Sequence, residues 1–147
     1  MTKPGEHLDP EGTAVGTAVV LSEAEKKSIL DAHNTFRARH GAPAVIWNAD
    51  AANGGKYGEN LAAGHKNFTT AIQGWYDEVN KYNFNKPGFG SGTGHFTQVV
   101  WKRTKTIGCV RRTCPKWTMY ICEYDPPGNI ATWDNLYFRD NVTPRQW

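Results

Sequence analysis

The sequence predicts a single α+β domain, and three observations support this class. Two segments, near residues 22–40 and 70–82, carry apolar residues at helical spacing. Two strand-like runs, 106–112 and 117–124, follow each other closely enough to form an antiparallel hairpin. The chain shows no internal repeat and no domain linker. Helices that alternate with antiparallel strands favour an α+β or three-layer arrangement over repeated βαβ units.

The domain is expected to occupy residues 22–147, after a poorly ordered, flexible arm over residues 1–21. Ser22 and Glu25 form a capping box that begins the first helix, and Gly41 helps to end it. The further elements expected in order are a short strand at 44–47, one helical turn at 48–52, a helix over 70–82, a short helix over 96–101, the hairpin, and a last strand at 132–138.

Composition indicates a globular protein with a mild positive charge. Aromatic residues make up 12% of the 147 residues, and the net charge is +3. This small excess of basic residues gives no indication of a nucleic-acid partner, and no apolar run reaches the roughly twenty residues that cross a bilayer. The N-terminal sequence lacks an apolar leader. It therefore belongs either to an intracellular protein or to a secreted one in which Met1 replaces a removed leader.

The three cysteines distinguish between these two interpretations. Cys109 and Cys122 lie equally far from the expected hairpin turn, so they would face each other at a separation suited to a disulfide. Cys114, in the turn, is left without a partner. Three reduced thiols in an intracellular protein remain the alternative, but the symmetry of the pair favours oxidation and therefore export.

Several motifs occur in an order that resembles the CAP superfamily of cysteine-rich secretory proteins, antigen five and class-one plant pathogenesis-related proteins. Its fungal, yeast-like branch is the most similar. The matching segments cover roughly residues 22–142 and imply a three-layer α-β-α sandwich with a central antiparallel sheet. They are AHNTFRARHGAP (32–43), YGENLAAG (57–64), GWYDEVNKYNF (74–84), GHFTQVVW (94–101) with IGC (107–109), and ICEYDPPGN (121–129).

Relatives of this kind carry two His and two Glu in a cleft proposed to hold a divalent metal. By motif, Glu59, Glu78 and His95 occupy three of these places, so the resemblance implies a weak zinc or magnesium site and no required cofactor. The fourth place departs from the pattern, because Ala52 and Asn53 stand where relatives carry the second His. About a helix's worth of residues is absent before YGENL. The shortening also explains the odd cysteine, since relatives place its partner in the missing segment.

This cleft has two interpretations. One His with two carboxylates and an open position suits a metal-dependent hydrolase, whereas hydrogen bonds among the same groups would brace the cleft. Ser91 and Thr93 lie near His95 in the sequence, but no third group is seen to orient a triad. We therefore predict that the chain is not an enzyme.

Tyr82, Phe84 and Phe89 follow the aromatic spacing called a caveolin-binding motif, which in yeast-like relatives lies on a loop associated with sterol binding. Flat aromatic faces on a loop shaped by Gly and Pro can cover a rigid apolar ring system. The alternative is that these rings anchor the loop to the core. Relatives also bind fatty acids between helices, where the equivalent channel here would be lined by Ile29, Phe36, Ile72, Trp75 and Val79.

The resemblance thus implies a secreted, extracellular protein that binds a sterol or fatty acid at the cell surface or in host interaction. The alternatives are the hydrolase and a signalling or effector protein that releases a C-terminal peptide after Asp125. The chain is expected to be a monomer or a Cys114-linked dimer without a nucleic-acid partner. The basic residues near the hairpin have two interpretations: they contact a membrane surface, or they form a solvated face. They are Lys102, Arg103, Lys105, Arg111, Arg112 and Lys116.

Overall fold

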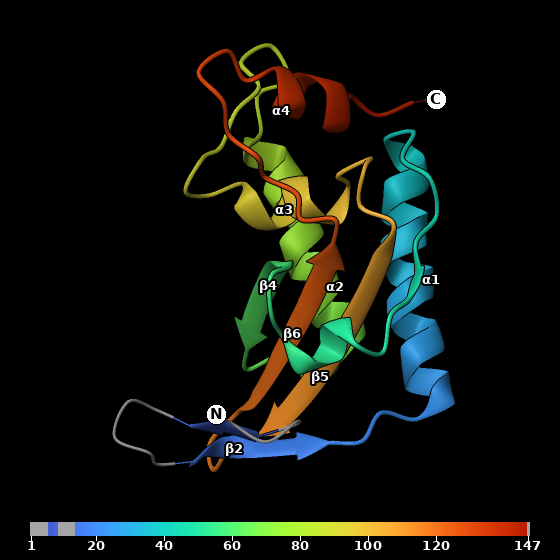
Figure 1. Cartoon of the computed structure of the whole chain (residues 1–147), viewed down its shortest axis with the longest axis vertical. Helices are drawn as coiled ribbons and strands as arrows, with labels where there is room; N and C mark the ends of the chain where they lie inside the picture. The colour runs from blue at the N-terminus through green and yellow to red at the C-terminus, as the bar shows by residue number, and fades with distance from the viewer. Residues whose placement is uncertain (1–5, 9–13, 147) are drawn as a thin grey trace.

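The computed structural model describes residues 6–8 and 14–146 and shows one twisted sheet backed by helices (Figure 1). The elements in chain order are β1 (Glu6–Leu8), β2 (Ala14–Val19), α1 (Glu23–Arg39), β3 (Ile46–Trp47), η1 (Ala51–Asn53), β4 (Gly58–Ala63), α2 (Phe68–Asp77), η2 (Glu78–Lys81), α3 (Gly94–Val99), β5 (Thr106–Thr113), β6 (Thr118–Asp125) and α4 (Leu136–Asn141).

The sheet has the order β1-β2-β5-β6-β4, with antiparallel pairing throughout, and β3 adds a short parallel pair with the first residues of β5. In Figure 1, α2 lies behind the long strands, α1 runs beside β5 on the right, and η1 lies in front of the strands. The predicted α+β sandwich is therefore confirmed. Its second outer layer consists of one 3₁₀ turn, and this turn packs so closely on Gly108 that a Cβ there would lie 2.6 Å from the Ala52 amide nitrogen.

Helix α1 begins at the predicted cap and is tied to the sheet by it. The Ser22 hydroxyl accepts a hydrogen bond from the Glu25 amide at 3.0 Å. The Glu25 carboxylate, expected to bond back to Ser22, accepts two hydrogen bonds from the Arg111 guanidinium at 2.8 and 3.0 Å. Since Arg111 lies on β5, this pair links the first turn of the helix to the sheet.

Residues 14–19 correct the expected flexible arm. They form β2, in which Thr17 pairs with Thr113 and Val19 pairs with Arg111. The run was not recognised as a strand because its partner lies far along the chain, so no local pattern revealed the pairing. Residues 1–5 and 9–13, which belong to the same expected arm, lie outside the described residues.

The last strand expected, at 132–138, is wrong. The Asp134 carboxylate accepts hydrogen bonds from the Thr132 hydroxyl at 2.7 Å and from the Leu136 amide at 3.2 Å. These bonds form a turn that leads into α4. Phe138 then packs edge-on against Trp101, with ring centroids 5.0 Å apart. Local side-chain capping therefore prevails over strand propensity in this segment.

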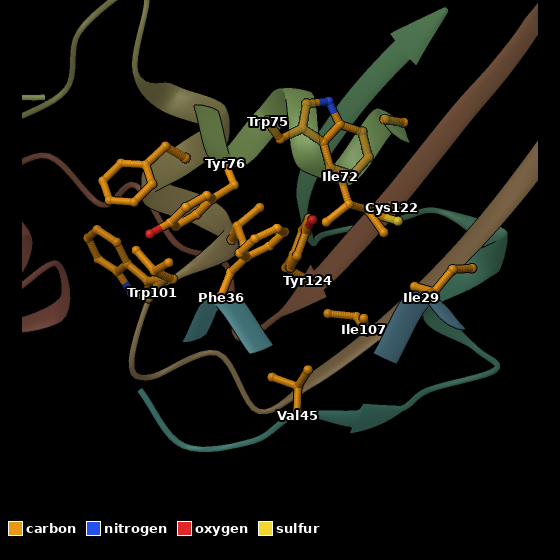
Figure 2. Packing of buried hydrophobic residues seen from close by; sticks show 14 of the residues in the cluster. Ile29, Phe36, Val45, Ile72, Trp75, Tyr76, Trp101, Ile107, Cys122 and Tyr124 are labelled. Atoms are coloured by element: carbon orange, nitrogen blue, oxygen red, sulfur yellow. The ribbon is translucent and has the colours of Figure 1, made fainter. Parts of the chain in front are cut away.

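The core fills the space between α1, α2 and the sheet (Figure 2). Phe36 of α1 stacks on Tyr76 of α2 with ring centroids 4.1 Å apart. Ile29, Ile72 and Trp75 belong to the same buried cluster, which includes the side chains expected to line a fatty-acid channel. In this structure those side chains pack against one another and the sheet.

The predicted disulfide between Cys109 and Cys122 is present and joins directly opposed residues of β5 and β6. Cys114 carries a free, buried thiol. Its Sγ lies 2.7 Å from the position that a Cβ would take on Gly16 of β2. A bridge from Cys114 to a second chain would require β2 to move, which disfavours the dimer that the sequence suggested.

Arg37 is a buried cation, 1% exposed, at the centre of the fold. Its guanidinium donates to the carbonyl oxygens of Pro43, Val99, Trp101 and Thr104 at 2.8 to 3.0 Å. Burial lowers the pKa of Arg37 to about 10, so the group remains charged at neutral pH. One side chain of α1 thereby holds the whole connection from α3 to β5.

We expect Arg37→Leu to lower the free energy of unfolding by about 3 kcal/mol or more, because buried carbonyl oxygens would lose their donor. Arg37→Lys should recover little of this loss, since one ammonium cannot reach carbonyls that diverge around a planar fork. Lys27→Leu, on the exposed side of the same helix, serves as the control and should change stability by less than about 1 kcal/mol. Urea unfolding followed by circular dichroism measures all three, and equal effects for Arg37→Leu and Lys27→Leu would contradict the assignment.

Candidate functional site

Glu78, the first residue of η2, clamps the start of α3. One carboxylate oxygen, Oε1, accepts hydrogen bonds from the backbone amides of His95 and Phe96 at 2.9 and 3.1 Å. The other, Oε2, lies 2.8 Å from His95 Nδ1. A carboxylate suits this place because the first amides of a helix have no partner within it. The geometry fits the bracing interpretation of the cleft.

The His95 ring is oriented by this carboxylate and by Trp75 of α2. The two rings are nearly parallel, with centroids 6.3 Å apart and an interplanar angle of 14°. The His95 side chain keeps 43% of its surface exposed, whereas that of Glu78 keeps 19%. The imidazole is therefore held in place by one edge and one face while remaining accessible to solvent.

Asn60 connects the same site to the core. Its amide donates to the His95 carbonyl at 3.1 Å and to the Tyr124 hydroxyl at 3.2 Å. The Tyr124 hydroxyl in turn lies 2.7 Å from His33 Nε2 on α1. Burial lowers the pKa of His33 to about 4, so this imidazole is neutral at physiological pH. Both of its ring nitrogens are hydrogen-bonded, Nδ1 with the Ile29 carbonyl and Nε2 with Tyr124, so it acts as a structural member of the network.

Glu59 does not join Glu78 and His95, which corrects the expected metal set. It lies directly across from Glu123 in the β4–β6 pair, close enough for the Glu59 carboxyl group to contribute, after burial, to the raised pKa of Glu123. Because side chains alternate along a strand, Glu59 points to the face opposite that of Asn60. In the described ranges, no three His, Cys, Asp or Glu side chains gather closely enough to hold a metal. The residues present therefore do not fit a divalent metal.

The aromatic loop divides into two anchors and one exposed ring. Tyr82 is 9% exposed and packs edge-on against Phe84 at 4.9 Å. Phe84 also meets Phe96 of α3 at 6.2 Å. Phe89 is 62% exposed, and its ring lies 3.0 Å from the position that a Cβ would take on Gly94. For Tyr82 and Phe84, this packing agrees with the anchoring alternative.

The basic residues near the hairpin do not form one patch. Arg111 pairs with Glu25, and Arg112 is only 7% exposed. The length of β5 separates Lys116 from the group at 102–105.

Sequence reasoning did not identify Asn60, Tyr124 or Glu123 as parts of the site. The alternation within ICEYD was a usable signal, because the bridge at Cys122 fixes which face Tyr124 shares and places Glu123 on the other one. The missing information was the pairing of β4 with β6, which joins segments far apart in the sequence.

Comparison with known proteins identifies clear relatives. The model of the CAP, cysteine-rich secretory protein family matches residues 50–124. "Secreted protein RBT4" of Candida albicans is 39% identical over 142 residues, which cover 79% of this chain and 40% of that protein. "Golgi-associated plant pathogenesis-related protein 1" of Homo sapiens is 32% identical over 141 residues, which cover 79% of this chain and 90% of that one. The crystal structure of NaASP2 with Zn²⁺ has a TM-score of 0.65 at 17% identity and covers 86% of this chain and 88% of that one, which shows a shared fold.

The alignments also measure the shortening. The human alignment extends over 141 residues but takes up 79% of the 147 residues here, about 116, so about 25 positions of that relative have no counterpart. The chain spans between 29% and 53% of the length of its relatives from Candida albicans and Saccharomyces cerevisiae. No helix among the residues described is long and apolar enough to cross a membrane.

The carboxyl pair of Glu59 and Glu123 leads to a prediction about pH. Burial, and then the neighbouring Glu59, raise the pKa of Glu123. The folded chain therefore holds a proton that the unfolded chain releases near pH 4.5, and this stabilisation is lost as pH rises through the folded pKa. We expect Glu123→Gln to raise the thermal unfolding midpoint at pH 8 and to flatten its decline above pH 5.

The matched control is Glu23→Gln, because the Glu23 side chain is 92% exposed on α1. Its unfolding midpoint should follow that of the unmodified chain from pH 5 to pH 9. If differential scanning calorimetry shows the same dependence of the unfolding midpoint on pH for Glu123→Gln and the unmodified chain, Glu123 does not hold the additional proton in the folded chain.

Proposed function

Because the chain belongs to the cysteine-rich secretory protein (CAP) family, we propose that it is a secreted protein that binds a sterol or a fatty acid and catalyses no reaction. It would act at the cell surface or in host interaction. Secretion is supported by the disulfide between Cys109 and Cys122 and by relatives named as secreted proteins.

The observation that carries the proposal is that two rings of the aromatic loop anchor it to the core while the third ring is exposed. Tyr82 and Phe84 fix the loop on Phe96, so Phe89 can remain exposed without the loop losing its position. Phe89 lies over Gly94, whose missing side chain leaves the ring a flat backbone seat. An exposed ring on a fixed loop offers a planar apolar face, which suits a rigid ring system such as a sterol.

The packing between the helices favours the aromatic loop, and not a channel between α1 and α2, as the lipid-binding site. Of the side chains expected to line a fatty-acid channel, Ile29 and Ile72 are fully buried in the core cluster, and Val79 packs against it. A fatty acid between α1 and α2 would have to separate the stacked rings of Phe36 and Tyr76. We therefore favour the sterol of the two lipids.

The absence of catalysis is supported by the bonding of Glu78. Both of its oxygens are hydrogen-bonded to the first residues of α3, so a role as general base would release the clamp that holds His95. Glu59, the third member of the expected hydrolytic set, lies across from Glu123 on the neighbouring strand.

Release of a peptide after Asp125 is disfavoured by packing. Phe138 is fully buried and Val142 is 3% exposed, and Phe138 covers Trp101. Cutting the chain at Pro126 and freeing this segment would expose part of the core, so the segment serves the fold.

Phe89→Ala should weaken sterol binding by about tenfold, the loss expected when one buried aromatic contact is removed. Its thermal midpoint should not change, because the ring lies outside the core. Trp117→Ala, which removes a 48% exposed ring from the β5–β6 turn, is the control and should bind normally. Titration of a fluorescent sterol delivered from detergent micelles, with oleic acid in a parallel series, measures both lipids. No saturable binding of either lipid by the unmodified chain would remove the proposal.

A further inference from the structure

Several exposed apolar side chains belong to residue 89 and to the segment 130–137, and the chain at these positions is drawn at and around α4 at the top of Figure 1. Trp133 is 95% exposed and Phe89 is 62% exposed. Less exposed neighbours complete the group, which we call the apolar tip and which consists of Phe89, Ile130, Trp133, Leu136 and Tyr137. A group of this kind on a soluble chain marks a contact with another body.

The tip consists of two loops that hold each other in place. Asn129 donates to the Gly94 carbonyl at 2.9 Å and accepts from the Thr97 hydroxyl at 2.6 Å. The Asn135 side-chain amide lies 3.2 Å from the position of a Cβ on Gly88, so the segment after β6 touches the aromatic loop directly. The segment after β6 is fixed to α3 by the hydrogen bonds of Asn129, and the aromatic loop is fixed by its packing on Phe96, so the exposed apolar side chains remain presented to solvent.

Basic side chains surround this group. The Arg103 guanidinium lies over the Tyr137 ring, 5.4 Å from its centroid, and the turn that carries it is fixed to α4 by a hydrogen bond from the Arg103 amide to Asn141 Oδ1 at 2.9 Å. Lys86 is exposed on the aromatic loop. Two carboxylates also lie near this group: Asp140 pairs with Arg139, and Asp134 stays charged because hydrogen bonds from Thr132 and Leu136 lower its pKa.

Aromatic rings with polar edges, flanked by Lys and Arg, suit the boundary between lipid headgroups and acyl chains. The rings gain apolar contact there, and each nearby cation is attracted by anionic lipid. We propose that the apolar tip docks onto the surface of an anionic phospholipid bilayer, with Trp133 entering the headgroup region and Arg103 contacting phosphate. The docking surface shares Phe89 with the proposed sterol-binding loop. Docking would therefore place this loop at the membrane that contains the sterol, an inference that rests on the proposed function.

Co-flotation with vesicles tests the docking. We expect the unmodified chain to float with vesicles of phosphatidylcholine mixed with phosphatidylserine and to bind vesicles of phosphatidylcholine alone more weakly. Trp133→Ala should weaken binding to the mixed vesicles by about tenfold. Arg103→Ser should weaken it by about fivefold on the mixed vesicles alone, and added salt should remove this difference.

Trp117→Ala is the matched control, because it removes an exposed tryptophan from the opposite end of the sheet and should float normally. Trp133→Ala should keep both its thermal midpoint and its sterol binding from micelles, which separates failure of docking from failure of the proposed function. The proposal is overturned if the unmodified chain ignores both vesicle types, or if Trp117→Ala loses as much binding as Trp133→Ala. It is equally overturned if light scattering shows self-association that Trp133→Ala abolishes, since the tip would then join two copies of the chain.

Discussion

The structure depends on the hydrogen bonds of one buried cation. Arg37 gathers carbonyl oxygens from the chain between α3 and β5, a stretch that has no regular structure to satisfy them. A buried carbonyl without a donor is costly, so the connection can be buried only with the guanidinium in place. The end of α3, the Trp101 ring beneath α4 and the position of Arg103 all follow from this arrangement.

A second polar system performs the same task one layer away. Asn60 and Glu78 bond to the backbone of α3 from β4 and η2, so the first turn of a helix of only six residues is held by side chains from outside it. The exposed His95 ring and the aromatic loop are presented by a part of the molecule that barely forms structure on its own. The position of His95 therefore depends on polar side chains, whereas the aromatic loop is held by the packing of Tyr82 and Phe84 on Phe96.

Local patterns in the sequence predicted what was local in the fold. The cap at Ser22, the first helix and the register that opposes Cys109 and Cys122 involve residues near one another, so periodicity and turn position were sufficient. Contacts between distant segments were not readable. Glu59 was expected beside His95, but β4 pairs with β6 and turns that carboxyl toward Glu123. Strand β2 was overlooked for the same reason, and α4 because a turn built by Asp134 overrode strand-like composition.

Gly108 leaves no room for a side chain between β5 and η1. Because this residue has no side chain, η1 can rest directly on the sheet. A methyl group there would overlap the backbone of Ala52. At Gly54, two residues after Ala52, a Cβ would have no atom within 4 Å. A side chain at position 108 would therefore push η1 off the sheet, whereas the chain that follows η1 has open space beside it.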